Sequence, residues 1–177
     1  MIRNGRHNAF ISHPKAASMA VNAVLLKNDW RKTSGHHEID FPLPKNVITI
    51  IREPRDWYVS WYFFRHVRVE KPWTPFAEWL ETNMHEDPFI ANGFFALKHT
   101  THLVFFDRLQ VGFDAVFGDL GLPRLEIPVH HATPDRDGAT ADEIFDEKAE
   151  NLLDKGMISC YDSLVQRVGD QPYLRIK

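Results

Sequence analysis

Short apolar runs alternate with polar turns and helical patterns along this chain. A buried strand is expected in each of three runs, at Asn8 to Ser12, Val47 to Ile51 and His102 to Phe106. Each run leads through a turn into a pattern typical of a helix, at Ser18 to Leu26, Pro54 to Phe64 and about 107 to 120. Repeated strand, turn and helix favours an α/β fold in which helices cover a parallel sheet.

Further helices are predicted in the second half of the chain. Thr74 and Pro75 open one that runs to about Thr82. Thr140 and Glu143 have capping-box spacing, which predicts a helix to about Lys155, and another is expected from Ile158 to Val168. No internal repeat or linker divides the sequence, so we expect a single domain over residues 1–177.

Composition narrows the classes of function. A net charge of −3 over 177 residues argues against a basic nucleic-acid binder or a generic membrane-surface protein, so any anion site must be local. Cys160 is the only cysteine, which excludes an intramolecular disulfide and a multi-cysteine zinc site. Without a signal-peptide pattern or a long apolar stretch, the chain is expected to be soluble and cytoplasmic, with no membrane span.

The loop before the first helix has the chemistry of an anion site. A strand-to-helix loop directs backbone N–H groups and the positive end of the helix dipole at one point, where Lys15 and Ser18 also lie. The alternative is that Ser18 caps the helix and Lys15 is a solvated loop residue. Because the loop has no glycine, it does not match the G-x-x-x-x-G-K-[ST] motif of ATP and GTP kinases.

A second cluster follows the second strand. Arg52 ends that strand at the edge where open α/β sheets bind ligands, and its guanidinium can bind a phosphate with two N–H groups. Ser60 is the one small polar residue in the apolar segment Trp57 to Phe64, so its hydroxyl needs a buried partner. Alternatively, Ser60 bonds to a carbonyl one turn earlier and Arg52 pairs with a carboxylate such as Glu53.

Both segments resemble elements of the sulfotransferases that use 3'-phosphoadenosine 5'-phosphosulfate (PAPS). Pro14-Lys15-Ala16-Ala17-Ser18 is similar to their P-K-x-[GA]-[ST] loop, in the style of the heparan sulfate 2-O-sulfotransferases. Their R-[ND]-P-x-[DE]-x-x-x-S-x-Y element is matched at Arg52, Pro54, Asp56, Ser60 and Tyr62. The resemblance implies a three-layer, P-loop-like fold with a central parallel sheet flanked by helices.

The resemblance also implies how the donor binds. Lys15, Ala16, Ala17, Ser18 and Met19 would hold the phosphosulfate, with Lys15 stabilising the leaving phosphate. Arg52 and Ser60 would bind the 3'-phosphate. Thr133 and Arg136, in the loop-like stretch His131 to Ala139, would contact the nucleotide.

A catalytic base is expected between the two phosphate elements. Sulfuryl transfer needs a group that accepts the proton of the acceptor hydroxyl, and an imidazole with a pKa of about 6.5 is suited to this. The resemblance implies that His36 or His37 has this role, with Glu38 as a third candidate. No metal site is expected, because adjacent histidines such as these, or His130 and His131, seldom converge on one ion.

The resulting hypothesis is a sulfotransferase that converts PAPS to 3',5'-bisphosphoadenosine (PAP) and sulfates a hydroxyl of a carbohydrate, such as a glycan, or of a small molecule. The alternatives are a kinase-like transferase, a non-catalytic module that binds PAP or PAPS, and a His-dependent hydrolase, for which the G-x-S-x-G motif is missing. Since the chain is shorter than typical sulfotransferases, a homo-oligomer could complete the acceptor cleft.

Overall fold

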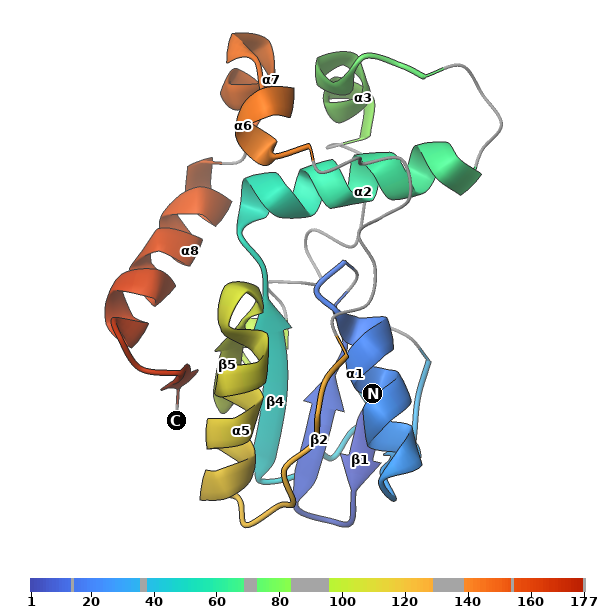
Figure 1. Cartoon of the computed structure of the whole chain (residues 1–177), viewed down its shortest axis with the longest axis vertical. Helices are drawn as coiled ribbons and strands as arrows, with labels where there is room; N and C mark the ends of the chain where they lie inside the picture. Colours follow the sequence, from blue (N-terminus) through green and yellow to red (C-terminus); the bar gives the residue numbers. More distant parts are fainter. Residues whose placement is uncertain are drawn as a thin grey trace. The chain divides into compact units, whose positions relative to one another are not determined.

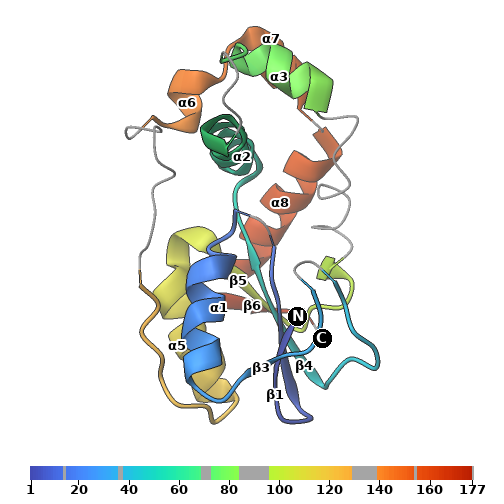
Figure 2. The same ribbon diagram turned by 90° about the vertical axis from the view of Figure 1, so that its right-hand side faces the viewer.

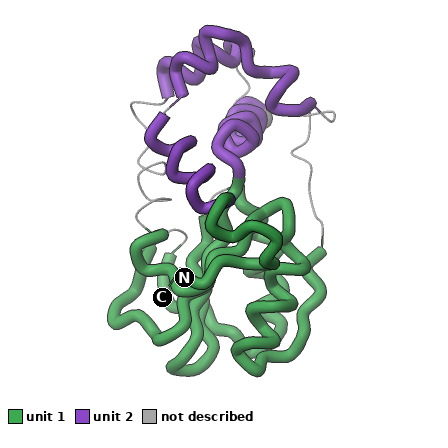
Figure 3. Tube along the Cα trace, turned by 90° about the vertical axis from the view of Figure 1, so that its left-hand side faces the viewer, with its two compact units in different colours: residues 1–52, 89–130, 166–177 green, residues 53–88, 131–165 purple. Residues whose placement is uncertain are grey.

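The computed structural model describes residues 1–13, 15–35, 38–68, 73–83, 96–128, 139–153 and 155–176. The chain divides into two compact units (Figure 3). Unit 1 comprises Met1–Arg52, Phe89–His130 and Gln166–Lys177, and unit 2 comprises Glu53–Pro88 and His131–Val165. The division into compact units does not test whether residues 1–177 form one domain, so the single domain remains a prediction.

Unit 1 is built on a six-stranded mixed sheet, within the part of the chain that the structure describes, and its strand order is β3-β1-β2-β4-β5-β6. The strands are β1 (Ile2–Asn4), β2 (Asn8–Ile11), β3 (Arg31–Lys32), β4 (Asn46–Ile51), β5 (His102–Phe105) and β6 (Tyr173–Arg175). The predicted α/β class and the three predicted strands are confirmed.

The predicted parallel sheet is found only in part, because the sheet is mixed. The central strands β2, β4 and β5 are parallel, whereas β1, β3 and β6 pair antiparallel to their neighbours. The reason lies in the connections. Parallel neighbours need a long crossover, as between β2 and β4, whereas a short turn at Gly5, with a φ of 59°, joins β1 to β2.

The sheet places the carboxyl ends of three parallel strands side by side. Ile11 of β2 pairs with Thr49 of β4, and Ile51 of β4 pairs with Phe105 of β5, so the carboxyl ends of the three parallel strands share one edge. Figures 1 and 2 show helices α1 (Ser18–Lys27) and α5 (Leu109–Asp119) together on one face of the sheet. Both contribute to the core that includes Phe10 and Ile48.

The opposite face of the sheet carries a second, smaller cluster. Ala9, Ile11 and Val47 lie there with Met1 and Ala96, and Ile39 and Leu43 pack against them. The alternation of side chains along β2 and β4 therefore sends Phe10 and Ile48 to the helical face and their neighbours to this one.

Unit 2 is helical in its described residues. It contains α2 (Pro54–Arg68), α3 (Phe76–Asn83), α6 (Ala141–Ile144), α7 (Glu147–Leu152) and most of α8 (Lys155–Val168). Together with α1 and α5 of unit 1, these make seven α-helices over the described residues. The rings of Phe76 and Trp79 on α3 pack edge-on against Tyr62 of α2. Arg55 joins α2 to Asp142 and Glu150 through N···O distances of 2.8 and 2.6 Å.

One predicted helix is interrupted. The capping box of Thr140 and Glu143 is present, but the helix it opens ends at Ile144 rather than at Lys155. Asp146 then accepts a 2.8 Å hydrogen bond from the N–H of Ala149 and opens α7. The second cap explains the break, because the Asp146 carboxylate satisfies an N–H group in the first turn of a new helix.

Of the helices described, none has both the length and the apolar character that crossing a membrane requires.

Candidate functional site

The loop between β2 and α1 has an unusual backbone. Lys15 and Ala17 have φ values of 60° and 55°, in the left-handed region that residues other than glycine usually avoid. Holding two such residues costs about 1 to 3 kcal/mol each. Ala16, between them, has only 1% of its surface exposed and packs in the helical-face core of unit 1. The buried methyl group therefore anchors the loop.

The backbone at the start of α1 has a conformation that is suited to binding an anion. Ala17, left-handed, is followed directly by the helical residue Ser18, and such a pair turns successive N–H groups toward one concave point. Ala17 is the N-cap of α1 and provides no side-chain hydrogen bond to the helix. The first turn of α1 thus has no cap from its own N-cap side chain.

Ser18 is the first residue of α1 and is buried, with 5% of its surface exposed. The alternative that Ser18 is the N-cap is therefore wrong, because Ala17 holds that position. The Met19 side chain is 72% exposed, so the contribution predicted for Met19 would come from its backbone N–H.

Arg52 reaches the same loop from the end of β4. Its Nη1 donates a 2.9 Å hydrogen bond to the carbonyl oxygen of Lys15. Its guanidinium carbon lies 4.3 Å from the centre of the Phe106 ring. Phe106 begins the short 3-10 helix η1 (Phe106–Arg108) directly after β5. Within unit 1, the structure therefore brings Arg52 together with the loop that contains Lys15.

Glu53 caps the N-terminus of α2. Its carboxylate accepts hydrogen bonds from the backbone N–H groups of Arg55, at 3.0 Å, and Asp56, at 2.6 Å. Glu53 stands where the sulfotransferase pattern has Asn or Asp, and it performs the capping function of those shorter residues. A carboxylate of the chain itself therefore occupies this helix terminus.

Ser60 lies on α2 in unit 2 and has 3% of its surface exposed, as expected for a serine within an apolar helix. Tyr62, the last residue of the matched element, donates a 2.7 Å hydrogen bond to the carbonyl oxygen of Thr74. Burial raises the pKa of Tyr62. Tyr62 therefore has a structural role in unit 2, and the predicted action of Ser60 together with Arg52 stays a prediction.

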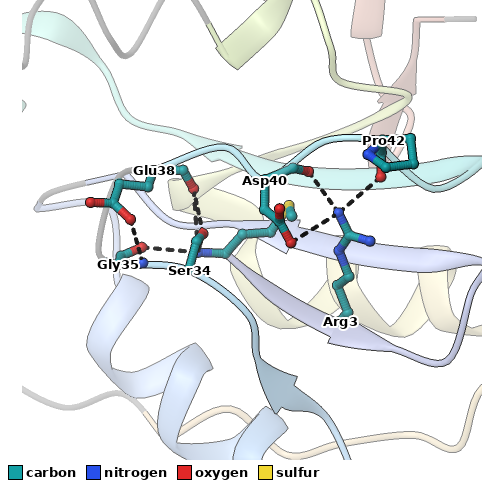
Figure 4. A network of polar contacts seen from close by, with 7 residues as sticks. Arg3, Ser34, Gly35, Glu38, Asp40 and Pro42 are labelled. Atoms are coloured by element: carbon teal, nitrogen blue, oxygen red, sulfur yellow. Dashed lines mark hydrogen bonds and ion pairs between the residues drawn. The ribbon is translucent and has the colours of Figure 1, made fainter.

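The two histidines predicted to supply the base, His36 and His37, lie outside the described residues. Figure 4 shows described residues that come before and after them in the sequence, together with Arg3. The carboxylate of Glu38 accepts a 2.8 Å hydrogen bond from the Gly35 N–H, and its carbonyl accepts one from Ser34 Oγ at 2.9 Å. Arg3 of β1 donates to the carbonyl oxygens of Asp40 and Pro42 at 2.6 and 2.9 Å. These contacts hold Ser34, Gly35, Glu38, Asp40 and Pro42 in place.

The third candidate base, Glu38, has a structural task. A Cβ atom at Gly35 would lie 2.7 Å from Glu38 Cδ, so the glycine makes room for the carboxylate. The Glu38 carboxylate is thus already engaged by the Gly35 N–H.

The other predicted contacts cannot be placed. Pro14, Thr133, Arg136, His130 and His131 lie outside the described residues. Over the ranges that the structure describes, no group of three or more His, Cys, Asp or Glu side chains is arranged to hold a metal ion.

The contact of Phe106 with Arg52 was not predicted, because the sequence pattern makes Phe106 the end of an apolar strand. The signal that could have identified this contact is the position of the two residues in the sheet. Ile51 pairs with Phe105, so Arg52 and Phe106 are the residues that follow two paired positions on neighbouring strands. That relation becomes visible only when the strand order is known.

Comparisons with known proteins give no match: no family model fits the chain, and neither a curated protein nor a solved structure matches it.

Proposed function

We propose that this chain is a PAPS-dependent sulfotransferase in which the β2–α1 loop and Arg52 bind the phosphate groups of the donor. The observation that carries the proposal is the hydrogen bond from Arg52 to the Lys15 carbonyl, because it joins the two segments that resemble the family's phosphate-binding elements. The absence of a side-chain cap from Ala17 and its left-handed backbone support it, since both favour an anion at the start of α1.

The fold of unit 1 is compatible with the three-layer, P-loop-like arrangement that we propose. Its central strands β2, β4 and β5 are parallel, and a loop and a helix follow β2. Open α/β sheets bind ligands at the carboxyl edge of such strands. Both Arg52 and the loop lie at that edge.

The proposed reaction is a direct displacement at sulfur. The acceptor hydroxyl oxygen forms a bond to sulfur while the bond from sulfur to the 5'-phosphate oxygen of PAPS breaks, and the products are a sulfate ester and PAP. His36 or His37 accepts the hydroxyl proton. Lys15 stabilises the negative charge that develops on the leaving phosphate oxygen.

In this proposal, Arg52 and Ser60 recognise the 3'-phosphate, which distinguishes PAPS from other adenine nucleotides. Thr133 and Arg136 contact the nucleotide. The acceptor is a hydroxyl-bearing molecule. A carbohydrate is favoured, because the Pro14 to Ser18 segment resembles the loop of the heparan sulfate 2-O-sulfotransferases.

Calorimetry with three nucleotides tests the donor. PAP should bind at least about tenfold more tightly than adenosine 5'-phosphosulfate, which lacks the 3'-phosphate, because charge-assisted hydrogen bonds contribute about 1.5 to 3 kcal/mol. Arg52→Ala should remove this preference, and Ser60→Ala should weaken it. Equal binding of the two nucleotides would contradict the roles of Arg52 and Ser60, and preferential binding of ATP with Mg²⁺ would favour a kinase-like transferase.

A second assay tests the base. PAP release from PAPS is measured with a panel of glycans and small hydroxyl compounds, for the wild type, His36→Ala, His37→Ala and Glu38→Gln, with PAP binding measured in parallel. One histidine variant should lose turnover and keep PAP binding. Wild-type turnover in both would exclude the histidines, and PAP binding without turnover on any acceptor would favour a non-catalytic module.

A further inference from the structure

The surroundings of the Arg52 guanidinium suggest a role for a residue that lies outside both matched motifs. An arginine side chain has several rotatable bonds, so a bidentate bond to phosphate requires that its planar end be held in one orientation. Two contacts do this within unit 1. The Lys15 carbonyl accepts from Nη1 at 2.9 Å, and the Phe106 ring lies 4.3 Å from the guanidinium carbon.

Phe106 is itself firmly placed. It follows β5, whose Phe105 pairs with Ile51 one residue before Arg52. It is partly buried, packs against the helical-face core of unit 1, and belongs to the short helix η1. The ring is therefore supported by the sheet and the core and can hold a neighbouring cation.

The contact is also specific for a ring. The face of an aromatic ring carries partial negative charge and attracts a cation within about 6 Å of its centre. A leucine of similar bulk would fill the same space without this attraction. The distance from Arg52 to the ring lies well within that range.

We propose that Phe106 is a positioning residue for Arg52: its ring and the Lys15 carbonyl together hold the guanidinium in the orientation that receives a phosphate of the nucleotide. This inference rests on the proposed function. It extends the donor site to β5 and makes three adjacent parallel strands contribute to it, through Lys15 after β2, Arg52 after β4 and Phe106 after β5.

The test is calorimetry with PAP on ring variants at position 106. Phe106→Leu should weaken PAP binding by about threefold to tenfold, because the cation–π attraction is lost. Phe106→Tyr and Phe106→Trp keep a ring face and should retain wild-type affinity. Phe117→Leu removes a ring from the same core at a position packed on Trp30, so it should leave PAP affinity unchanged and controls for general loosening.

A double-mutant cycle separates positioning from packing. In the Arg52→Ala background the cation is gone, so Phe106→Leu should have little further effect on PAP binding. A structural role would weaken binding equally in both backgrounds. In NMR spectra, the Arg52 side-chain N–H signals should be shifted by the ring current in the wild type and should lose that shift in Phe106→Leu.

The outcomes separate this inference from the proposed function. If the wild type binds PAP and Phe106→Leu binds it equally well, the role of Phe106 is wrong and the proposed function stands. Equal effects in the two backgrounds, or an Arg52 signal that Phe106→Leu does not move, also overturn the inference. If the wild type fails to bind PAP, the proposed function is wrong, and the phosphate-positioning role of Phe106 is wrong with it.

Discussion

Two strand-to-helix junctions of the molecule can be compared directly, because each follows a central parallel strand and leads into a long helix. Between β2 and α1, the N-cap Ala17 is left-handed and gives the helix no side-chain hydrogen bond. Between β4 and α2, the Glu53 carboxylate accepts from the N–H groups of Arg55 and Asp56. The start of α1 thus has no acidic side chain as its cap, whereas the start of α2 is capped by Glu53.

In the proposed function, the two phosphate-binding segments therefore act through different groups. At the first junction, backbone N–H groups and the helix dipole are suited to an anion. At the second, a carboxylate already satisfies the helix terminus, so any attraction for phosphate must come from side chains such as Arg52. A resemblance in sequence therefore covers two distinct physical mechanisms.

The largest effect is expected from giving the first junction an acidic cap. Ala17→Asp should weaken PAP binding by about 100-fold, because a like charge beside a bound anion costs several kcal/mol. Ala17→Asn has the same size without the charge and tolerates the left-handed backbone, so it should stay near wild-type affinity. Equal losses in the two variants, measured by calorimetry, would show that size rather than charge is responsible.

Removing the acidic cap of the second junction should affect stability and leave binding intact. Glu53→Ala should lower the free energy of unfolding in urea by about 1 kcal/mol, because two N–H groups of α2 lose their acceptor. Glu53→Gln keeps an oxygen acceptor and should lose less. PAP affinity should not fall in either variant. A fall comparable to that of Ala17→Asp would remove the distinction between the junctions.

The strain of the first junction can be measured through Ala17→Gly. Glycine adopts a φ of 55° without steric cost, so this variant should gain about 0.5 to 1 kcal/mol in the free energy of unfolding. Ala23→Gly, at an exposed site in the middle of the same helix, should lose about 1 kcal/mol. Destabilisation in both variants would mean that Ala17 is not strained in the folded protein.

The smallest effect is expected at His102 on β5, which belongs to neither junction and therefore serves as a reference for both. Burial lowers the pKa of His102 below its usual 6.5, so protonation favours the unfolded chain. The stability that depends on neutral His102 is complete above about pH 6.5 and is lost as the pH falls below that value. His102→Phe should reduce the loss of urea stability between about pH 7 and pH 5. An unchanged pH profile would exclude His102 as its source.

The sequence pattern predicts the central elements well, and the reasons are local. Strands β2, β4 and β5 and the helices α1 and α2 have continuous apolar patterns and clear turn residues, and all are found. The strands β1, β3 and β6 have two or three residues each, too few for a periodic pattern, and only pairing with a neighbour makes them strands. The break between α6 and α7 depends on the cap at Asp146, which was not recognised because the capping box at Thr140 already accounted for a helix start.

The candidate site was predictable in part for the same reason. Lys15 and Arg52 follow predicted strands, so their place at the sheet edge could be inferred. The bond between them and the contact with Phe106 depend on strand order, which no single segment encodes. The left-handed Ala17 was also unpredictable, since alanine usually avoids that conformation and the buried Ala16 beside it is what maintains it.

The buried methyl group of Ala16 has a consequence for kinetics. Because the core of unit 1 holds Ala16, the loop has its shape before any ligand arrives. A preformed loop requires no slow rearrangement on binding, so association with an anionic nucleotide should occur in one phase whose rate rises linearly with nucleotide concentration. Electrostatic attraction should make that rate fall as salt is added. Differences in affinity among loop variants should then be found mainly in how fast the nucleotide leaves.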